Sequence, residues 1–402
     1  MTAFRAAWVC PIDQPPLRDA VVETDNGVVT RIADSHNVAT SSRGITDLGQ
    51  VAVMPGLVNA HTHLELSWLR GRVPPATSFT NWVTGLFATR GAPDSAVSEE
   101  MIGLIHAAVS EARAAGTVAV GDITNSLASV EPMARAGMRG VVFHELLGFR
   151  ERDGALIEAS RDKRVAAGRH GIRISLAPHA PYSTSVELFM AIRKAVDVSE
   201  CPIMSVHLGE SPEEVELLEK GSGPWRAMLQ MIGAWRDDWQ VPGCGPVQFL
   251  ERHGAIDAKT LVVHGVQFDD AALGRLRGLG ATIVTCPRSN QWVGVGYPPI
   301  ERFYRSGVPV AVGTDSLASV EDLNLFSELQ TMRRLAPSVP ARTLLASATI
   351  VGARALGLDG ELGTIAPGKR AELIAVKVPE LVADVEEYLV GGITPSQVSW
   401  VN

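Results

Sequence analysis

One pattern recurs along most of the chain, from about residue 50 to about residue 345. Each unit has a run of apolar and β-branched residues, then a polar residue, then a helical pattern. The eight runs are VAVMPGLVNAHTH, GTVAVGDITNS, MRGVVFHELLG, GIRISLAPHAPYS, CPIMSVHLGES, KTLVVHGVQ, GATIVTCPRSN and GVPVAVGTDSLAS. Continuous apolar runs that alternate with amphipathic helices are typical of parallel strands joined by crossover helices. The sequence therefore predicts an α/β fold, and eight such units predict a (β/α)8 barrel, the TIM barrel.

The two ends of the chain have a different pattern. Residues 1–50, which include DAVVETDNGVVTRIAD, and residues 360–402, which include GTIAPGKRAELIAVKV, predict alternating strands separated by Gly and Asp turns. Neither piece has enough apolar surface to fold alone. We expect the two to form one small β-sandwich beside a barrel that spans residues 51–359.

Histidines follow the predicted strands at one end. His61 and His63 end the first strand, and residues i and i+2 of a strand point to the same side. The third to sixth strands and the eighth end in His144, His179, His207, His264 and Asp315, in that order. Catalytic groups of a (β/α)8 barrel come from the C-terminal ends of its strands. These side chains are therefore expected to meet at one rim.

Four of these residues form a candidate metal site: His61, His63, His207 and Asp315. A lone histidine is more often a part-buried core residue than a ligand, but that reading weakens for four positions at one rim. Nitrogen and carboxylate donors without thiolate suit zinc or ferrous iron. A bound divalent ion lowers the pKa of its water to about 7, so hydrolysis is the expected chemistry. No predicted strand ends in a lysine that could bridge two ions, which favours a single ion.

Three residues at this rim could carry the proton transfers. Glu210, three residues beyond His207 in HLGE, could accept a proton from the attacking water and pass it to a leaving group. Its alternative role is that of a helix N-terminal glutamate favoured by the helix dipole. His264 could orient the water or polarise the substrate. Asp315 could also take a proton from the water.

The fifth strand is followed by a long insertion, Ser211 to Lys259, that carries Trp225, Trp235 and Trp239. It could be a surface helix pair whose tryptophans pack on the barrel, or a lid that closes over substrate.

Composition excludes several classes of protein. Hydrophobic residues make up 46% of the 402 residues and charged residues 20%, as in compact soluble enzymes. A net charge of −8 without a basic cluster argues against a nucleic-acid partner. No apolar run approaches the length that spans a bilayer, and the four cysteines show no CxxC spacing. The sequence predicts a cytoplasmic protein with reduced thiols and a small-molecule substrate.

At this point the chain resembles the amidohydrolase superfamily along nearly its whole length. The motifs that carry the resemblance are PGLVNAHTH, HLGE, VVHG, CPRSN, VGTDS and GTIAPGKRAELIAV. Their combination resembles the branch that contains deaminases of cytosine, guanine, S-adenosylhomocysteine and aminodeoxyfutalosine, together with triazine hydrolases. The resemblance implies one divalent metal ion, zinc or iron with zinc favoured, on the four candidate ligands, with Glu210 as proton shuttle and His264 holding the water. Superfamily relatives are often dimers, which leaves a homodimer open.

The segments HTHLELS, SFTNWVTGLF, PHAPYS and CPRSN most resemble aminodeoxyfutalosine deaminases. This resemblance implies hydrolytic release of ammonia from an adenine nucleoside that carries a carboxylate, with His179 meeting the substrate. Arg288 could pair with that carboxylate or be a structural arginine at the rim. Glu65 could accept hydrogen bonds from ribose hydroxyls or bond to a neighbouring loop. Trp82 could cover the base, although packing on the barrel is slightly favoured.

Two other readings stay open. The same metal site could serve another hydrolase of the branch, such as an S-adenosylhomocysteine or guanine deaminase or a triazine chlorohydrolase. The chain could also be a catalytically inactive scaffold, although intact His61, His63, His207, Glu210 and Asp315 argue against this.

Overall fold

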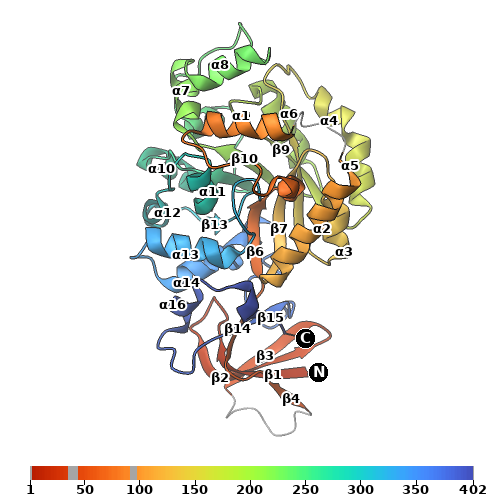
Figure 1. Ribbon diagram of the computed structural model, residues 1–402, viewed down its shortest axis with the longest axis vertical. Helices are drawn as coiled ribbons and strands as arrows, with labels where there is room; N and C mark the ends of the chain where they lie inside the picture. The colour runs from red at the N-terminus through yellow and green to blue at the C-terminus, as the bar shows by residue number, and fades with distance from the viewer. Residues whose placement is uncertain (1, 35–43, 91–96, 402) are drawn as a thin grey trace.

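The structure is a computed structural model that describes residues 2–34, 44–90 and 97–401. Figure 1 shows helices arranged around parallel strands in the upper part of the molecule, and a strand-rich lower part in which both chain ends lie.

The upper part contains two four-stranded sheets, with strand orders β6-β7-β8-β9 and β10-β11-β12-β13. Every neighbouring pair within them is parallel. The strands are β6 (Leu57–Thr62), β7 (Thr117–Thr124), β8 (Arg139–Leu146), β9 (Arg173–Pro178), β10 (Met204–Leu208), β11 (Thr260–His264), β12 (Thr282–Thr285) and β13 (Val310–Val312). Each of the eight predicted runs contains one of them, so the prediction of an α/β fold with parallel strands is confirmed.

Backbone hydrogen bonds connect the two sheets at both edges. His207 N in β10 donates to His179 O, directly after β9, at 3.0 Å. At the other edge Asp315 N, beyond β13, donates to His61 O in β6 at 3.1 Å, and Thr62 forms a parallel bridge with Asp315. The ends of strands from both sheets therefore lie close together.

The chain directly after β13 can pass very close to β6 because residue 313 is a glycine and has no side chain. A Cβ built on Gly313 would lie 2.6 Å from His61 O and 2.7 Å from His61 Cβ. Such distances are too short for non-bonded atoms, so only glycine fits there. This close approach brings Asp315 beside β6.

The helices cover the strands with amphipathic faces. In α2 (Glu99–Ala114) the Ser98 side chain caps the helix by accepting from Met101 N. The buried residues repeat at helical spacing: Ile105, Ala108, Val109 and Ala112. The other elements in this part are η2 (Leu64–Leu69), α1 (Phe79–Arg90), α3 (Val130–Arg135), α4 (Ala155–Ala159), α5 (Arg161–Gly168), α6 (Val186–Asp197), α10 (Asp270–Leu279), α11 (Pro287–Trp292), α12 (Ile300–Ser306), α13 (Leu325–Leu335), α14 (Ala341–Ser347) and α15 (Ile350–Ala355).

The insertion after β10 forms three helices: α7 (Pro212–Lys220), α8 (Pro224–Met231) and α9 (Pro246–Arg252). Helices α7 and α8 stand at the top of the molecule in Figure 1, beside α1. Trp235 and Trp239 pack against Phe149, with ring centroids 5.8 and 5.7 Å away. Two of the three tryptophans therefore pack as the surface-helix expectation proposed, whereas Trp225 has a different position, described below.

Strands from both ends of the chain form one seven-stranded sheet of order β15-β14-β5-β1-β2-β3, with β4 also paired to β1. The bounds in this part are β1 (Thr2–Val9), β2 (Leu17–Asp25), β3 (Val28–Asp34), β4 (Ile45–Asp47), β5 (Val51–Pro55), β14 (Leu373–Lys377), α16 (Val385–Leu389), η3 (Pro395–Gln397) and β15 (Val398–Trp400).

One boundary differs from the sequence expectation. The run VAVMPGLVNAHTH contains two strands, because the chain leaves β5 and enters β6 at Gly56. A Cβ on Gly56 would lie 2.9 Å from Val118 Cβ, so the chain passes closely over β7 at this point. Residues 51–55 therefore belong to the terminal sheet, and the parallel sheets begin at Leu57.

Two further observations bear on the sequence predictions. The four cysteines are free and buried. None of the helices in the described ranges is long and apolar enough to cross a bilayer.

Candidate active site

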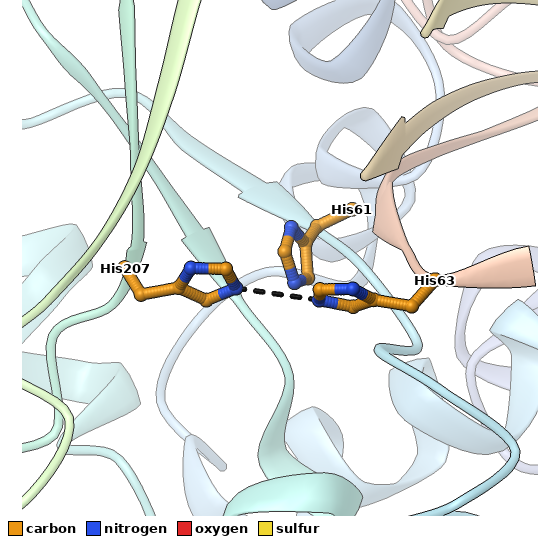
Figure 2. A group of neighbouring side chains, drawn as sticks. All are labelled: His61, His63 and His207. Carbon is orange, nitrogen blue, oxygen red and sulfur yellow. Dashed lines mark hydrogen bonds between the residues drawn. The ribbon is translucent and has the colours of Figure 1, made fainter. Parts of the chain in front are cut away.

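The predicted metal ligands come together at the ends of the strands. One possible ligand atom from each of His61, His63 and His207 lies within 4.8 Å of the others, and Figure 2 shows the three imidazoles turned toward one another. Nε2 of His63 is 3.3 Å from Nε2 of His207. Asp315 Oδ1 lies 3.7 Å from Nε2 of His61 and 3.6 Å from Nε2 of His63.

The polar atoms of this group fit a cation. His61 is fully buried, and neither of its ring nitrogens has a hydrogen-bond partner among the residues that the structure describes. Leaving buried polar atoms unpaired is costly, and a metal ion at this point would pair them. Burial lowers the pKa of His63 to about 4, so its imidazole is neutral at pH 7, as metal binding requires.

Two site residues have strained backbones. His264 has φ = 77° and Asp315 has φ = 61°, a left-handed conformation that side chains with a Cβ rarely adopt. Both lie where a strand ends and the chain turns away. Strain of this kind is found at functional sites, where the surrounding structure maintains it.

The first turn of α11 fixes the orientation of both strained residues. Ser289 Oγ donates to Asp315 Oδ2 at 2.6 Å, and the Asn290 amide nitrogen lies 3.0 Å from His264 Nδ1. The motif CPRSN therefore supplies the side chains that orient a predicted metal ligand and a predicted catalytic histidine.

Glu210 lies beside this group of predicted metal ligands. It is 3% exposed, and its Oε1 is 3.5 Å from Nε2 of His264. Burial raises the pKa of the Glu210 carboxyl well above its usual value, and the negative charge of Asp315 adds to this effect. Its backbone is held by buried Glu214, whose carboxylate accepts from Gly209 N and Glu210 N at 3.1 and 3.0 Å. A carboxyl group at this place can exchange protons with a substrate.

A cavity of about 340 Å³ opens onto these groups. Its lining includes the predicted site residues His63, His207, Glu210, His264 and Asp315. The walls are mainly apolar and include Leu66, Phe79, Trp82, Leu86, Phe149, Tyr182, Trp225, Leu229 and Val293. Trp225 of α8 stacks on Tyr182 with ring centroids 4.0 Å apart. Part of the insertion thus forms a wall of the cavity.

Two of the four predicted substrate contacts line this cavity. Trp82 stacks against Phe79 with ring centroids 6.2 Å apart and faces the cavity, so it both packs and forms a wall. His179 lines the cavity, and its Nδ1 lies 2.6 Å from Ser183 Oγ.

The structure does not bring Arg288 to the cavity. The Arg288 side chain donates to Glu328 Oε1 at 2.6 Å and to Asp322 Oδ1 at 3.0 Å. Glu328 is fully buried, so the guanidinium neutralises a buried carboxylate. These contacts favour the structural role for Arg288. They argue against the other expectation, that Arg288 pairs with a substrate carboxylate.

Glu65 is also engaged elsewhere. Its carboxylate accepts from Arg90, from Thr124 Oγ1 and from the backbone nitrogens of Asn125 and Ser126. It is buried outside the cavity lining. The structure therefore supports the alternative expectation for Glu65, a structural bond to a neighbouring loop.

The sequence did not predict several polar residues of the cavity, among them Arg90, Asn125 and Glu145. Glu145 follows His144 at the end of β8, and the run FHELLG was noted only for its histidine. A carboxylate at the end of a predicted strand was the available signal. The side chain of His144 instead lies 3.2 Å from the carbonyl of Asn125.

Residues 52–394 match the amidohydrolase family. The chain is 30% identical to a 5-methylthioadenosine/S-adenosylhomocysteine deaminase of Syntrophobacter fumaroxidans, over 89% of this chain and 80% of that protein. An adenosine deaminase from Xanthomonas campestris with bound zinc superposes with a TM-score of 0.82 at 25% identity, covering 99% of this chain and 90% of that one. Helicobacter pylori aminofutalosine deaminase in complex with methylthio-coformycin also gives a TM-score of 0.82, at 26% identity, covering 97% and 95%.

The chain belongs to the amidohydrolase family. Its similar proteins place it in the deaminase branch, whose members are hydrolases that act on carbon–nitrogen bonds. The resemblance stated from the sequence motifs is confirmed.

Proposed function

We propose that this protein is a metal-dependent deaminase of adenine nucleosides, similar to aminodeoxyfutalosine and methylthioadenosine deaminases. The observation that carries the proposal is the convergence of three histidines and Asp315 beside Glu210 and His264, at a cavity with aromatic walls. The names of the similar proteins support an adenine nucleoside as substrate.

His61, His63, His207 and Asp315 would hold the ion, and nitrogen and carboxylate donors suit zinc. Zinc in the Xanthomonas campestris protein supports this choice. When bound, such an ion activates a water molecule at neutral pH.

The reaction replaces the amino group of the adenine ring with oxygen. Water adds to the ring carbon that carries the amino group, and the C–N bond then breaks to release ammonia. Glu210 takes one proton from the water and gives it to the adjacent ring nitrogen, and it then takes the second proton from the added hydroxyl and gives it to the departing nitrogen. Asn290 donates to Nδ1 of His264, which leaves Nε2 as the protonated nitrogen, 3.5 Å from Glu210 Oε1. The ring product is a keto tautomer.

We also propose that the two parallel sheets close into one (β/α)8 barrel. The hydrogen bonds from His207 to His179 and from Asp315 to His61 support closure at both edges. The terminal strands would form the predicted β-sandwich around a buried apolar cluster that includes Ala6, Val22, Val53, Ile365 and Leu373. In this proposal β5 joins residues 1–50 and 360–402. The cytoplasmic location and a homodimer stay predictions.

The direct test is ammonia release by zinc-loaded protein, offered adenosine, 5′-methylthioadenosine, aminodeoxyfutalosine, guanine and a triazine. We expect turnover of the adenine nucleosides and none after the metal has been removed with a chelator. Turnover of guanine alone, chloride release from a chlorotriazine, or no turnover by fully metal-loaded protein would contradict the proposal.

A further inference from the structure

The cavity extends from the predicted metal ligands to the surface between apolar side chains. Helix α1 and helix α8, with the residue that follows α8, supply Trp82, Leu86, Phe87, Trp225, Leu229 and Ile232. Phe87 is 40% exposed and Ile232 is 61% exposed, so these two residues lie where the cavity reaches solvent. We call them the mouth. The predicted ligand His207 and the carboxyl group of Glu210 lie in the buried part.

The lining offers no unpaired positive charge to this part of the cavity. Arg90 is the only arginine or lysine among the described residues of the lining. Its guanidinium donates to the carboxylate of Glu65 and to the amide oxygen of Asn125, both at 3.0 Å. Glu65 is buried, and its negative charge balances that of Arg90.

Two arginines of the loop after β8 are also engaged. Arg150 and Arg152 are not part of the described lining. Arg150 donates to the carbonyl of Gly233 at 2.9 Å, and Arg152 donates to the carboxylate of Asp238 at 2.7 Å. Both contacts attach this loop to the insertion after β10, so neither guanidinium is directed to a ligand in the cavity.

The chemistry of an adenine nucleoside decides which part of it meets the mouth. The ring carbon that reacts belongs to the six-membered ring and must lie at the predicted metal ligands. The sugar is attached to the five-membered ring, at the other end of the base. The group on the 5′ carbon of the sugar is therefore the part of the molecule that extends farthest from the reacting carbon, toward Phe87 and Ile232.

The apolar walls treat charged and uncharged groups differently. An apolar 5′ group gains free energy when it leaves water for such walls. A carboxylate at the same place would lose part of its hydration without meeting a free cation, which is costly.

We propose that the mouth determines substrate specificity: the enzyme accepts adenine nucleosides with an uncharged, apolar group on the 5′ carbon and rejects those with a carboxylate there. This inference rests on the proposed function. It separates the two substrates in the name of the Syntrophobacter fumaroxidans protein. A methylthio group is uncharged, whereas the homocysteine group carries a carboxylate and an ammonium group.

The test uses two nucleosides of equal shape, 5′-S-isobutyl-5′-thioadenosine and 5′-S-carboxymethyl-5′-thioadenosine. They differ only in that two carboxylate oxygens replace two methyl groups. Ammonia release by the zinc-loaded parent gives kcat/KM for each. Burial of an apolar group of this size is worth about 10- to 100-fold, so we expect the parent to prefer the isobutyl compound by at least that factor.

The variant Ile232→Arg places a positive charge at the mouth, at an exposed position that tolerates a long side chain. A partner for the carboxylate should lower the preference at least about 5-fold, through higher activity on the carboxymethyl compound. This gain should be lost in about 1 M salt, where charges are screened over about 3 Å. Phe87→Arg replaces Ile232→Arg if that variant does not fold.

The matched control is Val198→Arg. Val198, like Ile232, is an exposed β-branched residue at the C-cap of a helix, here α6, but it lies outside the described lining of the cavity. This variant adds the same charge to the protein and should keep the parent preference. Zinc content is measured on every sample.

The outcomes separate the inference from the proposed function. Equal or faster turnover of the carboxymethyl compound by the parent would show that Arg90 or Arg150 can serve a second carboxylate, and would overturn the inference. An unchanged preference in both Ile232→Arg and Phe87→Arg would also overturn it, because the 5′ group would then not reach the mouth. Turnover of adenosine alone would leave the deaminase intact and refute the inference. If the zinc-loaded parent turns over none of the three nucleosides, the proposed function fails as well.

Discussion

Glu210 is the residue whose replacement should separate catalysis from metal binding. Glu210→Gln keeps the shape of the side chain but cannot carry protons between water, ring nitrogen and ammonia. Loss of a general acid–base group costs about 10²- to 10⁴-fold in rate, so we expect kcat to fall by that factor with zinc content unchanged. Ammonia release and metal analysis on the same sample measure both quantities.

The control is Glu219→Gln, at an exposed position in the last turn of α7, which should retain full activity. Near-normal deamination by Glu210→Gln would refute the assignment of the proton shuttle.

His61 is expected to be required for the ion itself. Its buried ring has no hydrogen-bond partner in the described chain, so His61→Ala should lose most bound zinc and, with it, activity. Elemental analysis of the purified protein measures this loss. His106→Ala, on the exposed side of α2 where the ring contacts Glu131, should bind as much zinc as the parent. Equal zinc in both variants would show that the ligand set is wrong.

At the scale of single residues, the sequence predicted those site residues whose positions follow from strand geometry. The ligand pair His61 and His63 follows from the two-residue repeat of a strand, and the other ligands follow from the shared rim. The substrate contacts depend on partners distant in the sequence. Arg288 is held by Asp322 and Glu328, 34 and 40 positions away, and no local pattern could reveal that its charge is already neutralised.

At the scale of elements, adding one methyl group at residue 313, directly after β13, should disturb the close packing of this segment against β6. The Cβ of Gly313→Ala would collide with backbone atoms of His61. Overpacking of this kind costs about 1–3 kcal/mol, and here it would also displace a metal ligand. We expect a lower free energy of unfolding in urea and weaker zinc binding.

Gly274→Ala is the matched control, because Gly274 lies within α10 with open space around its Cβ position. Replacing glycine by alanine in a helix stabilises by about 0.5–1 kcal/mol, so this variant should be slightly more stable than the parent. A parent-like stability for Gly313→Ala would contradict the close approach.

The strands were predictable as elements because their apolar runs are continuous and flanked by helical patterns. The division of the first run was not predicted, because β5 (VAVMP) is wholly apolar and β6 (LVNAHT) begins with apolar residues, so the two follow one another as one run. Only the pairing of β5 with β1 and β14 shows that the first half belongs to the terminal sheet. Periodicity describes which residues are buried, and it does not say which sheet buries them.

At the scale of the whole molecule, metal binding should stabilise the fold. A ligand that binds only the native state adds about 2.7 kcal/mol when present at one hundred times its Kd. Removing zinc with a chelator should therefore lower the Tm, and adding zinc back should restore it. Thermal scans of the parent and of His61→Ala measure the effect. A chelator-dependent shift of equal size in His61→Ala would place the stabilising ion elsewhere.

The order of the elements was accessible from sequence because each unit is local, a strand followed by its helix. How the two sheets contact each other was less accessible, since those contacts join residues far apart in the chain, such as Thr62 and Asp315. The number of repeated units indicated the architecture, and the hydrogen bonds at the sheet edges now support it.

The left-handed backbones of His264 and Asp315 have a consequence for the evolution of this enzyme. Each such residue costs of order 1–3 kcal/mol, so the site lowers the stability of the scaffold that carries it. Selection for thermal tolerance alone would favour asparagine or glycine at these positions and would erase the chemistry. Heat resistance must therefore be gained at other positions, which leaves the strand ends as the most constrained part of the chain.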